Sequence, residues 1–393
     1  MSGQTIHHLY LFEDRVSLIN IAYFYRHKKM EINRDNILKA LSEVIDPDLK
    51  QDLVSLNMIH NVQTKDDVIK FTVMLTTPAC PLKEMIRKDC EKAIFKHFGT
   101  DANLDIEMSS AVTAAKELGP MLPGVKNIIA VSSGKGGVGK STVAANLAVA
   151  LSKSGAKVGL IDADIFGPSV PTMFNCEHEQ PTVSQENGQS KILPIEQYGV
   201  KLMSIGFLAP ADGAVVWRGP MASSALKQFL SDTLWGDLDY LLIDLPPGTS
   251  DIHLTLVQSV PVTGAIVVTT PQKVAIADAQ KGIAMFRQQQ VNVPVLGVVE
   301  NMAYFTPEEL PENKYYIFGQ GGGEELAKKH DVSLLGQIPI VESIRESGDN
   351  GYPAVLKDDI TARAFEDLAQ SVAQQVAIRN ATLDKTKKVE ITV

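Results

Sequence analysis

The residues with the clearest capacity for chemistry lie between positions 134 and 141, where the sequence reads Gly-Lys-Gly-Gly-Val-Gly-Lys-Ser. Their spacing fits the pattern G-x-x-x-x-G-K-(S/T), in which glycines let successive backbone N–H groups point at phosphate oxygens. Lys140 is expected to reach the β- and γ-phosphates of ATP, and the Ser141 hydroxyl is expected to bind Mg²⁺. The residues expected to hold the nucleotide at this loop are Gly134, Lys135, Gly136, Gly137, Val138, Gly139, Lys140, Ser141 and Thr142.

The segments on either side have the patterns that such a loop requires. Residues 127–131 form a short apolar run typical of a buried parallel strand, and residues 141–152 carry apolar side chains at helical spacing. A helix that starts at the loop adds the positive end of its dipole to the phosphate site. A glycine-rich turn without a ligand is the alternative interpretation, and the order of strand, loop and helix argues against it.

Three carboxylates follow apolar strands and are expected at one edge of a sheet. Asp162 and Asp164 come after the strand predicted at residues 157–161, and Asp244 ends the strand predicted from Asp239. In open parallel sheets, ligands bind at the carboxyl ends of the strands. Asp164 is the first candidate for orienting the attacking water and Asp162 the second, while a loop cap is the alternative role for both. Asp244 is expected to hold Mg²⁺ through water.

Two further segments are expected to respond to the nucleotide. Residues 246–251, Pro-Pro-Gly-Thr-Ser-Asp, follow Asp244 and are predicted to be the switch that senses the γ-phosphate. Asn301 comes just after the strand predicted at residues 293–299, where its amide is placed to read the base. A turn cap is an equally good explanation of Asn301.

Composition and charge narrow the classes of function. The chain has 393 residues, 45% of them hydrophobic and 21% charged, with a net charge of −9. That charge argues weakly against a broad nucleic-acid surface, and no run approaches the roughly 18 apolar residues of a membrane span. Three cysteines make no disulfide framework, which favours a reducing compartment such as the cytoplasm.

The order of patterns along the chain predicts more than one domain. Repeated strand and helix patterns predict an α/β fold with a doubly wound, mostly parallel sheet, preceded by a small α/β domain and a linker rich in small residues. The first segment matches neither a signal peptide nor the helical pattern that follows, so a poorly structured extension or a natural start at Met30 is expected. The expected parts are residues 1–29, the extension; 30–108, the small domain; 109–125, the linker; 126–375, the P-loop ATPase domain; and 376–393, the tail.

Cys80 is the cysteine best placed for chemistry. It lies in the run Thr-Thr-Pro-Ala-Cys-Pro-Leu at residues 76–82, between a predicted strand end and a helix start, and a helix N-terminus lowers the pKa of a thiol. A small buried apolar residue is an equally good explanation of Cys80. Cys90, inside the predicted helix, is expected to pack in the core.

By these residues the chain resembles the Mrp/ApbC-type iron–sulfur cluster carrier ATPases, within the MinD/ParA-like class that has a deviant Walker A box. The resemblance covers roughly residues 31–375, and the piece around Cys80 is similar to the small iron–sulfur assembly domain that many members carry. The extra lysine, Lys135, implies a residue that reaches the nucleotide of the other subunit in a homodimer. The motifs that carry the resemblance lie at residues 134–141, 162–169, 217–221, 239–249, 300–302 and 338–349.

The resemblance implies ATP hydrolysis by a homodimer that holds a 4Fe-4S cluster and passes it to apo iron–sulfur proteins. Many members carry a Cys-x-x-Cys pair shortly after the Glu-Asn-Met motif, whereas residues 303–314 of this chain contain no cysteine. Thiolates are the usual cluster ligands, so Cys80 is the expected ligand and the cluster is expected to be held weakly. The alternative is an assembly ATPase that holds no cluster itself.

Two other functions compete with this one. A MinD/ParA-like positioning ATPase would need a basic amphipathic C-terminal helix for a membrane or a basic face for DNA, and neither the tail nor the net charge provides it. A metabolic P-loop enzyme would need an acceptor site, and the sequence reveals none. The expected partners are a second copy of the chain, apo iron–sulfur proteins and assembly factors, with no nucleic acid and no membrane.

Overall fold

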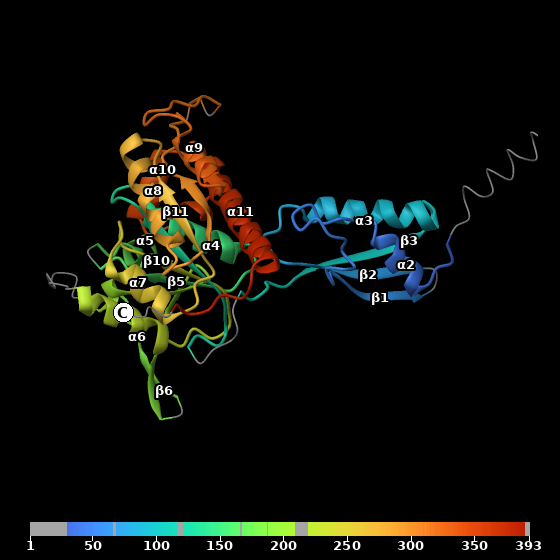
Figure 1. Cartoon of the computed structure of the whole chain (residues 1–393), viewed down its shortest axis with the longest axis horizontal. Helices are drawn as coiled ribbons and strands as arrows, with labels where there is room; N and C mark the ends of the chain where they lie inside the picture. Colours follow the sequence, from blue (N-terminus) through green and yellow to red (C-terminus); the bar gives the residue numbers. More distant parts are fainter. Residues whose placement is uncertain are drawn as a thin grey trace, which may run out of the picture. The chain divides into compact units, whose positions relative to one another are not determined.

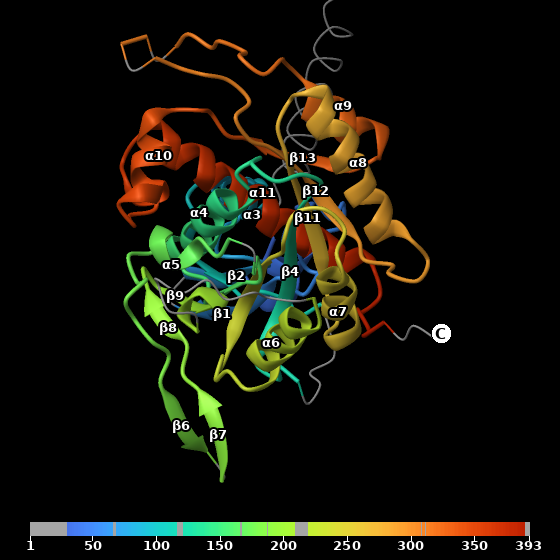
Figure 2. The same ribbon diagram turned by 90° about the vertical axis from the view of Figure 1, so that its left-hand side faces the viewer.

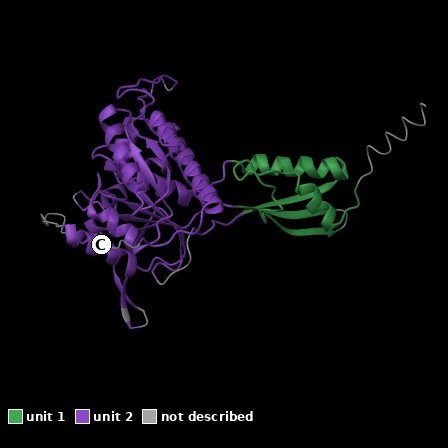
Figure 3. Ribbon diagram, viewed as in Figure 1, with its two compact units in different colours: residues 1–75, 82–109 green, residues 76–81, 110–393 purple. Residues whose placement is uncertain are grey.

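The chain forms two compact units (Figures 1 and 3). The computed structural model describes residues 30–65, 68–115, 121–165, 167–186, 188–208, 219–307, 309–310 and 312–389. The smaller unit comprises residues 30–75 and 82–109, and the larger unit comprises residues 76–81 and the chain from residue 110 onward. The extension predicted at residues 1–29 lies outside the described residues. In the described ranges, no helix combines the length and apolar character needed to cross a membrane.

The smaller unit is a three-stranded sheet accompanied by two helices. The strand order is β1-β2-β3, and β1 pairs with β2 in antiparallel fashion. The first helix starts where it does because the Asn33 side chain accepts a hydrogen bond from the backbone nitrogen of Asn36, at 2.9 Å. The elements are α2 (Arg34–Leu41), β1 (Ile59–Lys65), β2 (Val68–Leu75), α3 (Lys83–Phe98) and β3 (Asn103–Ser110).

The larger unit is built on an eight-stranded sheet in the order β13-β12-β11-β4-β10-β5-β9-β8 (Figure 2). Neighbouring strands are parallel except β8, which pairs antiparallel with β9 at the edge. The strands are β4 (Val125–Ser133), β5 (Val158–Asp162), β8 (Ile195–Gln197), β9 (Val200–Ser204), β10 (Leu238–Asp244), β11 (Gly264–Thr269), β12 (Val295–Glu300) and β13 (Ser333–Gln337). The doubly wound, mostly parallel sheet predicted from the sequence is confirmed.

Helices cover both faces of this sheet, because successive side chains of each buried strand point to opposite sides. On β4, Ile129 and Val131 join the apolar core formed with α4 and α11, whereas Ile128 and Ala130 join the core formed with α6 and α7. The helices are α4 (Lys140–Lys153), α5 (Val170–Met173), α6 (Gly219–Ser231), α7 (Asp251–Ser259), α8 (Lys273–Arg287), α9 (Gly322–Lys329), α10 (Glu342–Asp349) and α11 (Ile360–Thr382), with short 3₁₀ turns at Ile205–Phe207 and Ala354–Leu356.

Two features lie at the margins of the larger unit. Strands β6 (Val183–Glu186) and β7 (Gln189–Ile192) form an antiparallel hairpin that extends away from the main sheet (Figure 2). The last helix, α11, continues past residue 375, where the tail was predicted to begin, and reaches Thr382, because Val376 and Arg379 on it are buried. Of the motif predicted at residues 217–221, only the part from Gly219 lies within the described residues, at the start of α6.

Residues 76–81, which contain Cys80, pack on the larger unit. The Thr77 hydroxyl lies 3.3 Å from the Tyr240 hydroxyl on β10, and Ala79 belongs to the apolar core that includes α4. Tyr240 is 1% exposed, and burial raises its pKa to about 12, so its hydroxyl stays protonated near neutral pH. The cysteine segment is therefore anchored to the strand that carries Asp244 at its other end.

We expect Tyr240→Phe to loosen this anchor without disturbing the sheet. The ring still fills its space, but Thr77 loses its buried partner, at a cost of about 1 kcal/mol. Hydrogen exchange measured by mass spectrometry should become faster in peptides that cover residues 76–81 and stay unchanged in α4. Tyr352→Phe, at a tyrosine that is 45% exposed, is the control. Equal hydrogen-exchange rates for residues 76–81 in wild type and Tyr240→Phe would contradict the idea that Tyr240 anchors this segment.

Candidate active site

The glycine-rich loop joins β4 to α4 in a tightly curled form. Gly137 and Gly139 both have φ of +78°, a left-handed conformation that favours glycine. A Cβ atom on Gly139 would also lie 2.2 Å from the side-chain nitrogen of Asn301, so a larger residue has no room. Because α4 begins at Lys140, the loop leads directly into the positive end of a helix dipole. This backbone can surround a phosphate group with N–H donors.

Side chains on both sides of the loop hold it in this form. Ser133 Oγ donates a hydrogen bond to the backbone oxygen of Lys135 at 3.0 Å, and Asn301 Nδ2 donates to the backbone oxygen of Val138 at 2.9 Å. The second contact has no signal in the local sequence, because Asn301 is far from the loop along the chain. The amide of Asn301 thus supports the loop, and its predicted role as the reader of the base stays a prediction.

Lys140 lies in a buried cluster of opposite charge at the end of the loop. Its side chain is 6% exposed, and its Nζ atom lies 2.6 Å from Asp244 Oδ1 and 3.7 Å from Asp164 Oδ2. Nζ also donates to Ser141 Oγ at 3.2 Å. The structure therefore brings together the four side chains that the sequence predicted for phosphate, metal and water.

The surroundings of Asp244 fit a divalent cation. Its second oxygen, Oδ2, is buried and has no hydrogen-bond partner among the described residues. Burial raises the pKa of Asp244, while Lys140 and the Ser141 hydroxyl oppose that change. Carboxylate, hydroxyl and phosphate oxygens are the ligands that Mg²⁺ prefers, so Asp244 and Ser141 can hold Mg²⁺ together with the nucleotide. When bound, the ion would neutralise charge that develops on the phosphates.

Asp162 has a structural position that separates its role from that of Asp164. Its fully buried carboxylate accepts hydrogen bonds from Ser204 Oγ at 3.0 Å and from the backbone nitrogens of Val170 and Asp164, both at 3.2 Å. Burial, followed by the charge of Asp244, raises the pKa of Asp162 to about 7. Asp162 is thus occupied in holding the following loop, whereas Asp164 is partly exposed and faces Lys140. This arrangement favours Asp164 as the group that orients water.

The segment predicted as the switch lies against the glycine-rich loop. The backbone nitrogen of Gly248 donates to the backbone oxygen of Ser133 at 2.8 Å. A Cβ atom on Gly136 would lie 3.8 Å from the side chain of Pro247. Lys135 is exposed, in contrast to the buried Lys140, and is therefore accessible to another molecule. The switch segment is thus placed to detect a change at the loop.

The three cysteines differ in their access to solvent. Cys90 on α3 and Cys176 are 0% and 1% exposed, and burial raises the pKa of each thiol to about 12. Cys80 is half-buried. No group of three or more His, Cys, Asp or Glu side chains in the described ranges is arranged to hold a metal ion. Cys80 therefore remains the candidate for a cluster ligand, and it would need ligands from elsewhere.

The stretch that follows Asn301 folds back on itself instead of presenting cysteines. Phe305 and Tyr315 exchange backbone hydrogen bonds of 2.8 Å in both directions, and the Lys314 ammonium lies 4.2 Å from the centre of the Tyr304 ring. Tyr315 and Ile317 are 48% and 60% exposed. The described residues from 303 to 317 thus form a segment rich in aromatic side chains, called the aromatic segment below.

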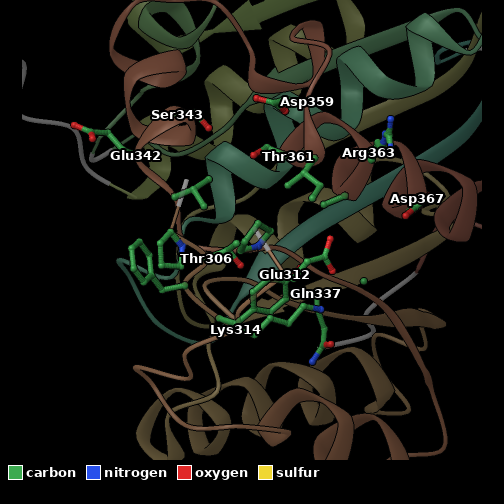
Figure 4. A pocket seen from close by; sticks show the side chains of 18 of the residues that line it. Thr306, Glu312, Lys314, Gln337, Glu342, Ser343, Asp359, Thr361, Arg363 and Asp367 are labelled. Carbon is green, nitrogen blue, oxygen red and sulfur yellow. The ribbon is translucent and has the colours of Figure 1, made fainter. Parts of the chain in front are cut away.

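A cavity of about 1150 Å³ lies between the aromatic segment, the end of β13 and the starts of α10 and α11 (Figure 4). Its carboxylates are Glu309, Glu312, Glu342, Glu346, Asp359 and Asp367, and its basic side chains are Lys314 and Arg363. Excess negative charge repels phosphate groups, and in the part of the chain that the structure describes none of the loop residues 134–141 lines this cavity. The glycine-rich loop is therefore the better match for a nucleotide.

The fold and the site define a P-loop NTPase, and comparison with known families specifies it further. A family model described as NUBPL iron-transfer P-loop NTPase matches residues 124–376, and one described as iron–sulfur cluster assembly protein matches residues 34–103. The chain belongs to the NUBPL iron-transfer P-loop NTPase family. The family resemblance stated from the sequence motifs is confirmed, and so is the assignment as an ATPase.

Individual relatives agree with this family. A protein of Synechocystis named iron–sulfur cluster carrier protein is 47% identical over 352 residues, which are 88% of this chain and 99% of the relative. An Escherichia coli protein of the same name is 46% identical over 354 residues, 89% of this chain and 94% of the relative. Among solved structures, a nucleotide-binding protein of Archaeoglobus fulgidus in complex with ADP is 40% identical with a TM-score of 0.54, covering 63% of this chain and 95% of that protein.

The buried position of Lys140 leads to a direct prediction. Lys140→Ala removes the cation that can stabilise charge on the β- and γ-phosphates, so Mg²⁺-dependent ATP hydrolysis should fall at least about 100-fold. Phosphate release by the full-length chain is the measurement. Lys153→Ala is the control on the same helix, because that lysine is 46% exposed and pairs with Glu366. ATP hydrolysis at the wild-type rate in Lys140→Ala would contradict the assignment of Lys140 to the nucleotide site.

Proposed function

We propose that this protein is an ATP-hydrolysing carrier that binds an iron–sulfur cluster and transfers it to apo iron–sulfur proteins. The observation that carries the ATPase half is the cluster of Lys140, Asp164, Asp244 and Ser141 at the end of the glycine-rich loop. The carrier half is supported by full-length relatives that bear the name iron–sulfur cluster carrier protein. The cytoplasmic location expected from the sequence stays a prediction.

The hydrolytic step follows from the placement of these side chains. The loop amides and Lys140 bind the β- and γ-phosphates, and Asp164 holds a water molecule in line with the γ-phosphorus. The water oxygen bonds to phosphorus as the bond from phosphorus to the bridging oxygen breaks, which yields ADP and inorganic phosphate. The Lys140 ammonium has three N–H donors, so it can donate to oxygens of the β- and γ-phosphates as well as to Asp244 Oδ1, from which Nζ lies 2.6 Å.

The protein acts as a homodimer in this proposal. Lys135 is exposed, although it belongs to the nucleotide loop, and the site already has a buried cation in Lys140. A second lysine is explained if it neutralises the phosphates of the nucleotide bound by the other subunit. Such a contact in trans makes hydrolysis depend on dimer formation.

The cluster is a substrate that is held for a short time. Cys80 is the accessible thiol, and a 4Fe-4S cluster normally takes four thiolate ligands. Two copies of Cys80 in a dimer supply two of them, so carboxylates, other thiols or groups of a client protein must complete the set. Incomplete ligation favours release to an apoprotein with a full set of cysteines.

A second candidate function is an assembly ATPase that holds no cluster itself. The specific observation in its favour is the aromatic segment at residues 303–317, which has no cysteine. Burial of Cys90 and Cys176 points the same way, because a buried thiol with a raised pKa is a poor ligand. In this case ATP binding would drive contacts with other assembly factors.

Mixing two inactive variants tests the action of Lys135 in trans. Lys135→Ala and Lys140→Ala subunits should each be inactive alone. In a mixed dimer, the site that keeps Lys140 also receives Lys135 from its partner. Random pairing makes about half of the dimers mixed, so about a quarter of the wild-type rate should return. No recovery, although native mass spectrometry detects the mixed dimer, would contradict action in trans.

Reconstitution with iron and sulfide under anaerobic conditions separates the two candidate functions. Wild type should bind both elements and develop the visible absorbance of a cluster, and Cys80→Ala should bind far less. Cys176→Ala is the matched control, because this thiol is buried in the same unit as Cys80. Equal binding by wild type and Cys80→Ala would show that Cys80 is not the ligand. No binding by wild type would favour the assembly ATPase.

A further inference from the structure

One buried side chain connects the switch segment to the strand that leads into the phosphate loop. His253 lies in the first turn of α7, which begins at Asp251, the last residue of the predicted switch segment 246–251, and it is 2% exposed. Its Nδ1 atom lies 3.3 Å from both the backbone nitrogen and the Oγ atom of Ser250. Its Nε2 atom lies 3.3 Å from Ser132 Oγ on β4. The imidazole therefore bridges the start of α7 and the end of β4.

The hydrogen bonds determine which ring nitrogen carries the proton. The backbone N–H of Ser250 can only donate, so Nδ1 accepts and the proton lies on Nε2, which donates to Ser132. Burial lowers the pKa of His253 to about 4, so the ring is neutral near neutral pH. A neutral imidazole with one donor and one acceptor matches this position. An apolar side chain of equal size would remove the hydrogen bonds that His253 makes with Ser250 and Ser132.

The bridge acts where the switch segment meets the loop. Ser132 is followed by Ser133, whose backbone oxygen accepts the hydrogen bond from Gly248. The backbone nitrogen of Leu245, directly before the segment, donates to the backbone oxygen of Val131 on the same strand at 3.0 Å. The imidazole attaches the far end of the segment, where Ser250 caps the N-terminus of α7. Without it, the segment beyond Gly248 loses its fixed end.

The remainder of α7 is held by other contacts. Ile252, Leu256 and Val257 are buried in the core shared with α6 and the sheet. Thr255 Oγ1 donates to Ser223 Oγ on α6 at 3.0 Å. Removal of the imidazole should therefore leave the helix in place and release only its first turn.

We propose that His253 is a positioning residue for ATP hydrolysis, which holds Ser250 and the switch segment against β4 in the place where the γ-phosphate is sensed. The inference rests on the ATPase activity, not on the cluster. Because the bridge touches neither the loop amides nor Lys140, it acts on the hydrolytic step and leaves ground-state binding of the nucleotide unchanged.

Steady-state kinetics of the full-length chain test this role. His253→Ala should lower kcat about tenfold, while KM for ATP and the affinity for ADP stay within about twofold. Ser132→Ala, which removes the partner on β4 and leaves the histidine in place, should lower kcat in the same way. The kcat of the double variant should equal that of the more impaired single variant, because both changes break the same bridge. His253→Gln, which can still donate to Ser132, should regain part of the lost kcat.

Thr255→Val provides the matched control. Thr255 is also a buried residue of α7, and this change removes its hydrogen bond to Ser223 on α6, which has no link to β4. It should keep the wild-type kcat. Hydrogen exchange at residues 246–250 should become faster in His253→Ala and stay unchanged in Thr255→Val. If His253→Ala fails to fold, Ser132→Ala alone decides. A wild-type kcat in Ser132→Ala, or an equal loss in Thr255→Val, would overturn the proposal. Absence of hydrolysis in wild type would instead overturn the ATPase activity.

Discussion

The buried contact between Lys140 and Asp244 is the interaction on which the site depends. An ammonium and a carboxylate removed from water must neutralise each other, since breaking one partner of such a pair costs roughly 3–5 kcal/mol. The pair joins the helix that follows the phosphate loop to the strand β10 at the centre of the sheet. It also holds a cation where phosphates bind. The pair therefore places a cation and a carboxylate side by side where phosphates and Mg²⁺ are expected to bind.

The other parts of the site are arranged around this pair. Asp162 uses its carboxylate to fix the loop that carries Asp164, and His253 fixes the segment that follows Asp244. The opposite end of β10 contacts Thr77 of the cysteine segment through Tyr240. The same strand thus contacts the segment that offers a thiol and carries the carboxylate of the nucleotide site. This shared strand gives the protein a physical link between its two proposed activities.

The parts of this structure that depend on residue patterns within short segments could be predicted from the sequence. The glycine-rich loop, the doubly wound sheet and the carboxylates at strand ends all follow from local spacing. Three contacts join residues far apart in the chain. They are the hydrogen bonds from Asn301 to Val138, from Ser204 to Asp162, and between His253 and Ser132. The attachment of residues 76–81 to the larger unit depends on Tyr240 and has no local signal. Such contacts need the fold before they can be identified.

The most direct measurement is a crystal structure of the full-length chain with Mg²⁺ and a non-hydrolysable ATP analogue. The triphosphate is expected to lie on residues 134–141, with Lys140 in contact with the β- and γ-phosphates and Mg²⁺ held on the side of Ser141 and Asp244. Lys135 of the second subunit is expected to contact the same nucleotide. A nucleotide bound in the acidic cavity, or a Lys140 that makes no contact with the triphosphate, would contradict this site.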